Sequence, residues 1–160
     1  GCLVGSEMCI RDRMMDCFAT KAKDAVDRLR DNGVKIGLLR PRLLRPFPEQ
    51  QIQQALTGKK AVAVIDQNIS MGKGGVLHTE IASALYGQSD APILASFIGG
   101  LGGRDISAEE FYQIAASLQE AAQQNETPAP RLLYTEEELR GMRKLQAIAH
   151  VEREELNSKE

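Results

Sequence analysis

The sequence predicts an open α/β fold built on a largely parallel sheet. Short β-rich runs alternate along the chain with segments whose apolar residues recur every three or four positions. Turns rich in glycine or proline separate these segments, as is typical of successive βα units. Because binding loops in such sheets follow the carboxyl ends of the strands, three loops become candidates for a functional site: 40–47, 66–75 and 99–105.

Local signals support each predicted element of the first two-thirds. Asn32-Gly33 closes the first helix, since glycine readily adopts the left-handed conformation found at helix ends. Three prolines in RPRLLRPFP exclude regular structure before the second helix, which Pro48 is well placed to open. In order, we expect a helix at 15–32, a strand at 34–39, a helix at 48–56, a strand at 61–66, a helix at 76–86 and a strand at 93–98.

Two capping boxes mark the helices of the C-terminal part. Ser107 is followed by Glu110, and Thr135 by Glu138, and each pair can satisfy free N–H groups at a helix start. A polar linker is expected between these two helices, at 123–130. The last helix is predicted over 136–156, where apolar residues recurring every three positions form a narrow stripe. That stripe suits docking on a partner, and a solvated surface helix is the alternative interpretation.

Composition and charge exclude several classes of function. The 160 residues include 20 Lys+Arg and 22 Asp+Glu, so a net charge of -2 gives no general attraction to nucleic acid or to an anionic membrane. Aromatic residues are 4% with no Trp, which argues against a base-stacking surface. No apolar run approaches the ~18 residues of a membrane span. We therefore expect a cytoplasmic domain with neither nucleic acid nor membrane as a partner.

The first thirteen residues, GCLVGSEMCIRDR, differ from the rest of the chain. They show no sustained helical or strand period, they hold two of the three cysteines, and they lack the basic start of a signal peptide. The string resembles an adapter-derived translation fused to open reading frames in shotgun assemblies, and a genuine N-terminal arm is the alternative. We expect residues 1–13 to be non-native and the chain to be a C-terminal fragment of a longer protein.

Glycines give two of the loops their candidate residues. The run MGKGG does not match the spacing of a phosphate-binding loop. Gly74 and Gly75 nevertheless precede a helix, where backbone N–H groups can bind an anion, although a tight turn is the simpler interpretation. In GGLGGRD, Gly102 and Gly103 lose conformational entropy on ordering, which is costly unless another backbone or a ligand approaches closely.

Charged residues extend these candidates without completing a catalytic site. Arg104 and Asp105 can pair with each other, or Arg104 can point at a phosphate, a carboxylate or a partner chain. Between positions 34 and 60 six Lys+Arg, including Arg45, stand against one Glu, which fits a solvated face, an acidic ligand or an acidic partner. The two histidines are isolated, so we assign neither catalytic nor metal-ligating residues.

Three motifs in order now carry a family resemblance: Arg45-Pro46-Phe47-Pro48, Asp66-Gln67-Asn68 and GGLGGRD. From 15 to 122 the chain resembles the C-terminal half of the alpha subunit of 2-oxoacid:ferredoxin oxidoreductases, the pyruvate enzyme in particular. The resemblance implies a three-layer transketolase C-terminal-like domain over 14–126 and a linker with a charged helix over 127–160. It also implies that an apolar first strand is missing or replaced by 1–13, and hence weak stability for the isolated chain.

The resemblance further implies a reaction and its cofactors. A 2-oxoacid is oxidatively decarboxylated on thiamine diphosphate with Mg, the acyl group passes to coenzyme A, and iron–sulfur clusters deliver electrons to ferredoxin. The family's cofactors lie in other domains, so this chain is expected to bind none alone, to be inactive alone, and to contact other domains and subunits of the complex. The candidate interface or anion-binding residues are Arg45, Gly74, Gly75, Gly102, Gly103, Arg104 and Asp105. The alternatives are a stand-alone anion- or nucleotide-binding module and another transketolase-like enzyme's C-terminal domain.

Overall fold

The computed structural model of the chain describes residues 8–12, 16–41, 43–70 and 74–157. Its strands are β1 (Met8–Asp12), β2 (Ile36–Leu39), β3 (Ala61–Asp66), β4 (Ile93–Ile98) and β5 (Arg131–Leu132). Its helices are α1 (Asp16–Asp31), α2 (Glu49–Leu56), α3 (Val76–Leu85), α4 (Ala108–Gln124) and α5 (Glu136–Asn157), with a short 3-10 helix at Leu101–Gly103.

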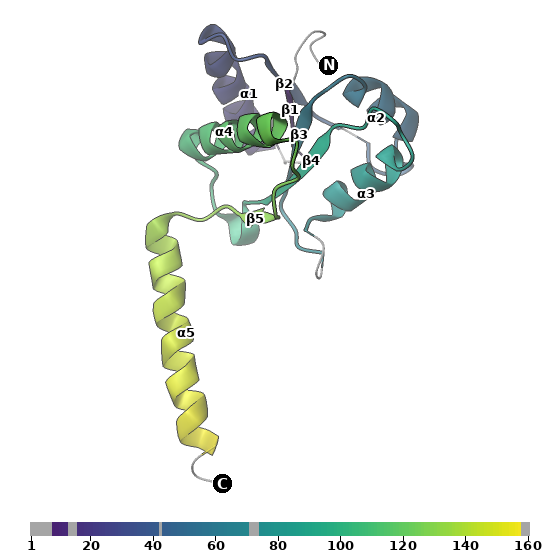
Figure 1. The fold of residues 1–160 in the computed structure, drawn as a ribbon. Coiled ribbons are helices and arrows are strands. Elements are labelled where there is room, and N and C mark those ends of the chain that lie inside the picture. Colours follow the sequence, from purple (N-terminus) through teal and green to yellow (C-terminus); the bar gives the residue numbers. More distant parts are fainter. Residues whose placement is uncertain (1–7, 13–15, 42, 71–73, 158–160) are drawn as a thin grey trace.

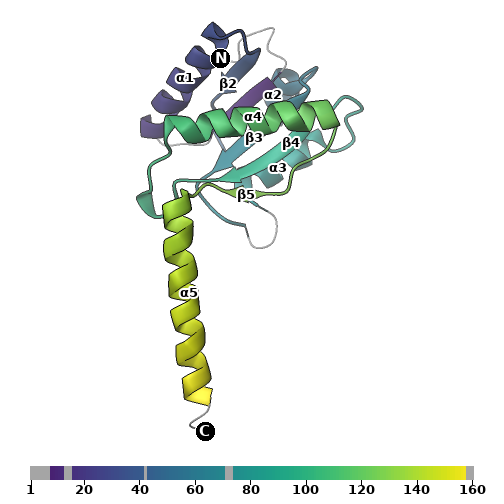
Figure 2. The same ribbon diagram turned by 60° about the vertical axis from the view of Figure 1, so that its left-hand side comes forward.

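Three layers make up the body of the molecule, as predicted. The five strands form one sheet in the order β2-β1-β3-β4-β5, and every pairing is parallel. Helices α1 and α4 cover one face of the sheet, and α2 and α3 cover the other (Figures 1 and 2). The helices bury the sheet on both faces, which is the usual arrangement of parallel sheets.

Strand β1 decides between the two alternatives predicted for the first strand, missing or replaced by 1–13. It lies inside the sheet, where Met8 pairs with Ile36 of β2 on one side and with Ala61 of β3 on the other. The first strand is therefore not missing, because residues from the 1–13 segment occupy its position. A strand of five residues in a sheet covered on both faces needs no alternating pattern, so periodicity could not reveal it. The predicted weak stability assumed open edges facing this position, and both edges are paired here.

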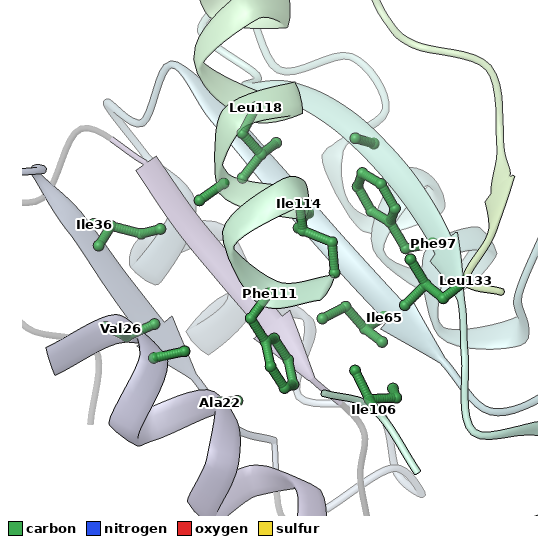
Figure 3. Packing of buried hydrophobic residues seen from close by; sticks show 14 of the residues in the cluster. Ala22, Val26, Ile36, Ile65, Phe97, Ile106, Phe111, Ile114, Leu118 and Leu133 are labelled. Carbon is green, nitrogen blue, oxygen red and sulfur yellow. The ribbon is translucent and has the colours of Figure 1, made fainter. Parts of the chain in front are cut away.

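The core lies on both faces of β3, whose six residues are all buried. Ala61, Ala63 and Ile65 belong to the cluster under α1 and α4, whereas Val62 and Val64 belong to the cluster under α2 and α3. Figure 3 shows the first cluster, in which Phe111, Ile114 and Leu118 of α4 lie over the sheet beside Ile65 and Phe97. The continuous apolar run AVAVI is thus explained by burial of successive side chains on opposite faces.

The C-terminal part leaves the three layers. Before it does so, Arg131 pairs with Phe97 of β4 and Leu133 is buried in the first core cluster, so sheet contacts continue past residue 126. Helix α5 then projects away from the body, and in both views no other element runs beside it (Figures 1 and 2). None of the helices in the described ranges is both long and apolar enough to cross a membrane.

Candidate functional site

The three predicted loops lie together at the carboxyl-terminal edge of the sheet. They follow β2, β3 and β4, which run in the same direction, so their ends reach the same edge. Helix α5 departs from this edge as well (Figure 1). The candidate site is therefore made of loop residues, and most of their partners lie far away in the sequence.

Asp66 organises the loop after β3. Its side chain is fully buried, Oδ1 accepts the Leu77 N–H at 3.0 Å, and Oδ2 accepts the His78 N–H at 3.0 Å. Asn68 Oδ1 accepts the Val76 N–H at 2.9 Å. The opening N–H groups of α3 thus have partners within the chain, and the negative carboxylate lies where the helix dipole favours it.

Gly74 and Gly75 form the tight turn into α3. A Cβ at position 75 would lie 2.0 Å from Asp66 Oδ2, and a Cβ at position 74 would lie 2.6 Å from the Oγ of buried Ser96. The structure therefore favours the turn interpretation of these glycines. The N–H groups of residues 76–78 are already bound to Asp66 and Asn68.

Arg104 joins three elements at the same edge. Its Nη1 donates to Glu110 at 2.9 Å, its Nε donates to Glu138 at 2.5 Å, and its guanidinium carbon lies 5.8 Å from the centre of the Tyr134 ring. Only 16% of the Arg104 side chain is exposed, whereas 37% of the Glu138 side chain is exposed. Both carboxylates are the third helical residues of the predicted capping boxes, and both boxes are confirmed by reciprocal hydrogen bonds with Ser107 and Thr135.

Of the arrangements predicted for Arg104, the structure shows the one in which it points at carboxylates rather than the pairing with Asp105. Asp105 forms its ion pair with Lys21 of α1, while Arg104 turns to Glu110 and Glu138. Arg104 has an extended backbone, with φ -60° and ψ 135°, so neighbouring side chains point to opposite sides. The two residues therefore connect the loop to different parts of the fold.

The charges of this network shift several pKa values. The hydrogen bond from Arg104 lowers the pKa of Glu138 to about 2, with a further contribution from the Thr135 N–H. The same hydrogen bond with Glu138 raises the pKa of Arg104. The hydrogen bond from Lys21 lowers the pKa of Asp105, and burial lowers the pKa of His78. For Arg104, Asp105 and Glu138, each pKa shift favours the charged form of the side chain.

Arg45 connects the proline-rich loop to α3. Its Nη2 lies 2.6 Å from Glu80 Oε1, and its Nη1 donates to the Leu44 carbonyl at 2.8 Å. Because 68% of the Arg45 side chain is exposed, this ion pair contributes little to stability.

The basic stretch between 34 and 60 does not form one face, because Lys35 and Lys60 precede β2 and β3 at the amino-terminal edge of the sheet, opposite Arg45. Arg42, also in that stretch, is outside the described residues.

Gly102 and Gly103 are exposed within the short 3-10 helix. Their φ angles are +66° and +83°, and a Cβ at either position would meet nothing within 4 Å, so the turn itself explains them. The close approach expected of this loop occurs at Gly99, where a Cβ would lie 2.7 Å from Leu133 and 2.8 Å from Ile106. The approaching groups are side chains of the chain itself.

The polar side chains described at the carboxyl edge bind partners within the chain. Within the ranges given above, no group of three or more His, Cys, Asp or Glu could hold a metal ion. His78 offers its backbone N–H to Asp66, and Glu80 is paired with Arg45. Sequence reasoning missed the role of Asp66 and the joining of both capping boxes by Arg104, although both boxes were recognisable.

Substitution of Gly75 tests the close approach at Asp66. In Gly75→Ala the new Cβ must displace the carboxylate or the turn, which weakens the hydrogen bonds to Leu77 and His78. We expect the free energy of unfolding to fall by about 3 kcal/mol, measured by urea denaturation. Gly141→Ala in α5 is the matched control, because its Cβ meets nothing within 4 Å. Equal losses in both variants would contradict the close approach.

The low pKa of Glu138 predicts a pH dependence. The ordinary value is 4.5 and the folded value is about 2, so the charged carboxylate stabilises the folded contact with Arg104. This contribution is complete above pH 4.5 and is lost as the pH falls toward 2. A carbon-13 NMR titration of the Glu138 carboxyl should show a midpoint near 2, which Arg104→Gln should move back toward 4.5. A midpoint already near 4.5 in the unmodified chain would show that the contact is absent.

Residues 14–111 match the family described as pyruvate:ferredoxin oxidoreductase core domain II. The match begins directly after the thirteen residues that the sequence set apart. The pyruvate synthase subunit PorA of Thermotoga maritima is 45% identical over 87 residues, covering 54% of this chain and 22% of that protein. The ketoisovalerate oxidoreductase subunit VorA of Pyrococcus furiosus is 42% identical over 93 residues, covering 58% of this chain and 24% of that protein. The chain thus spans about a quarter of the length of these relatives.

Solved structures agree on the fold. A split-gene transketolase described as an inactive beta4 tetramer aligns with a TM-score of 0.56 at 16% identity, covering 74% of this chain and 39% of that chain. A second aligned structure is the 2-oxoglutarate:ferredoxin oxidoreductase from Magnetococcus marinus, solved with 2-oxoglutarate, coenzyme A and succinyl-CoA bound. It aligns with a TM-score of 0.52 at 22% identity, and the alignment covers 77% of this chain and 19% of that chain. The transketolase-like architecture is therefore confirmed. With 14–111 matched, the chain belongs to the pyruvate:ferredoxin oxidoreductase core domain II family.

Proposed function

We propose that this chain forms core domain II in the alpha subunit of a thiamine-diphosphate-dependent 2-oxoacid:ferredoxin oxidoreductase. Such an enzyme decarboxylates a 2-oxoacid oxidatively, transfers the acyl group to coenzyme A and passes the electrons to ferredoxin. The family match over 14–111 carries the proposal, and relatives named as pyruvate synthase and ketoisovalerate oxidoreductase subunits support it. In this proposal the enzyme works in the cytoplasm, where coenzyme A is available.

The described residues do not fit the cofactors of that reaction. A diphosphate at the first turn of α3 would compete with Asp66 and Asn68 for the N–H groups of residues 76–78. Iron–sulfur clusters need several thiolate ligands, and the described ranges bring no such group together. Thiamine diphosphate, Mg and the clusters are therefore assigned to other parts of the enzyme. The same contacts count against a stand-alone anion-binding module.

The role assigned to this domain is structural. Arg45, Asp66, Arg104 and Asp105 all have partners within the chain, and these contacts hold the loops in one arrangement at the carboxyl edge. Rigid loops of this kind can position neighbouring domains and subunits without taking part in the chemistry. The isolated chain is accordingly inactive, and ferredoxin is reached only through the assembled enzyme.

A segment exchange tests the proposal. Residues 14–111 replace the matching segment of PorA from Thermotoga maritima, and the hybrid is produced with the remaining subunits of that enzyme. We expect the hybrid to assemble and to reduce ferredoxin with pyruvate and coenzyme A, because the two segments share the fold and 45% of aligned residues. The control hybrid carries the corresponding segment of the transketolase, which has the same fold at 16% identity. An assembled hybrid no more active than this control would contradict the proposal.

A further inference from the structure

Helix α5 is joined to the body of the molecule through two residues. Leu133 is anchored, because its side chain is buried in the first core cluster and its N–H donates to the Ile98 carbonyl at 2.8 Å. Helix α5 begins at Glu136, so only Tyr134 and Thr135 lie between this anchor and the helix. The direction in which α5 leaves the body therefore depends on the backbone dihedral angles of these two residues and on contacts near the start of the helix.

Packing of the described side chains along α5 gives little help in fixing that direction. No other element runs beside the helix in either view (Figures 1 and 2). The apolar residues Leu139, Leu145 and Ile148, which belong to the predicted stripe, are all exposed. Burial of an apolar face, which holds most helices of folded proteins in place, is therefore weak for this part of α5.

Arg104 contacts the chain on both sides of the junction. Before the helix, its guanidinium carbon lies 5.8 Å from the centre of the Tyr134 ring, and within the helix its Nε donates to Glu138 at 2.5 Å. Its Nη1 donates to Glu110 of α4 at 2.9 Å, and only 9% of the Glu110 side chain is exposed. Because a guanidinium is planar and its N–H groups point in fixed directions, these contacts together restrict where Glu138 can lie.

The loop that carries Arg104 is itself held at both ends. At its start the Gly99 N–H donates to the backbone carbonyl of Asp66 at 3.0 Å, and at its end Asp105 pairs with Lys21 of α1. The loop is thus tied to the sheet and to α1, and the Arg104 side chain is tied to α4. The contact with Glu138 extends this fixed arrangement to α5.

We propose that Arg104, Glu110, Tyr134 and Glu138 form a clamp that sets the direction of α5 relative to the body. When the contact with Glu138 is broken, α5 turns about residues 134–135 as a hinge and stays helical. The 22 residues of α5 span about 33 Å, so a turn of about 20° at the hinge moves the far end by about 11 Å. A small change at the carboxyl edge thereby becomes a large displacement of the C-terminal helix. The inference concerns this chain alone and does not rest on the proposed function.

The test compares the alignment of α4 and α5 in the full chain by NMR. Amide residual dipolar couplings, measured in a stretched polyacrylamide gel, report how strongly each helix is ordered in a common frame. Glu138→Gln removes the charge that Arg104 binds, but glutamine can still complete the capping box with Thr135. Glu137→Gln is the matched control, because it removes the same charge from the same helical turn at an exposed residue.

We expect α4 and α5 to fit one alignment tensor in the unmodified chain and in the control. In Glu138→Gln the order of α5 should fall about twofold or more relative to α4, because the released helix samples several directions. Carbon-13 chemical shifts over 136–157 should stay helical in both variants. This readout separates release of the helix from unfolding of its first turn.

Arg104→Gln is a second variant, which leaves the capping box of α5 untouched. Glu110 keeps Ser107 as a partner in this variant, so α4 still has its own capping box. The order of α5 should fall as it does in Glu138→Gln, and Arg104→Gln decides alone if the first turn of α5 unfolds in the other variant.

Three results would overturn the inference. Helix α5 could keep the order of the unmodified chain in a variant whose first turn is intact. It could lose as much order in Glu137→Gln as in Glu138→Gln, which would show a general effect of charge. It could also be ordered independently of α4 in the unmodified chain, which would show that no clamp is closed.

Discussion

The buried carboxylate of Asp66, placed at the start of α3, is the contact on which the carboxyl edge depends. It joins the end of the central β3 strand to the first turn of a helix, and it satisfies two N–H groups that would otherwise lack partners. Gly75 is required beside it because no side chain fits against the carboxylate. Once α3 is set in this way, Leu77 and Ile81 reach the second core cluster and Glu80 can hold Arg45 in the neighbouring loop.

A second contact extends the same principle to the C-terminal part. Arg104 lies between the two glutamates of the capping boxes and thereby couples the start of α4 to the start of α5. Asp66, Arg104 and Asp105 thus bind partners within the chain, while apolar side chains are exposed at the edge and on α5. An edge of this composition suits protein contacts better than capture of a small anion, and it agrees with a supporting domain in a larger enzyme.

Local signals were enough to predict most of the fold. The runs at 61–66 and 93–98 became β3 and β4, and the boxes Ser107–Glu110 and Thr135–Glu138 opened the helices as expected. The contacts that define the site connect residues far apart in sequence: Arg104 with Glu138, Asp105 with Lys21, and Arg45 with Glu80. No local pattern encodes such pairs, because several acidic partners were equally available. Strand β1 escaped prediction for the opposite reason, since its position is set by its neighbours rather than by a period of its own.

Among the residues that the structure describes, the polar groups of the carboxyl edge bind partners within the chain rather than an external anion. Titration calorimetry of the purified chain with inorganic pyrophosphate, thiamine diphosphate and coenzyme A tests it most directly. We expect no saturable heat with any of the three, because the N–H groups at the start of α3 and the Arg104 guanidinium are already bound within the chain. Stoichiometric binding with a dissociation constant in the micromolar range would contradict it.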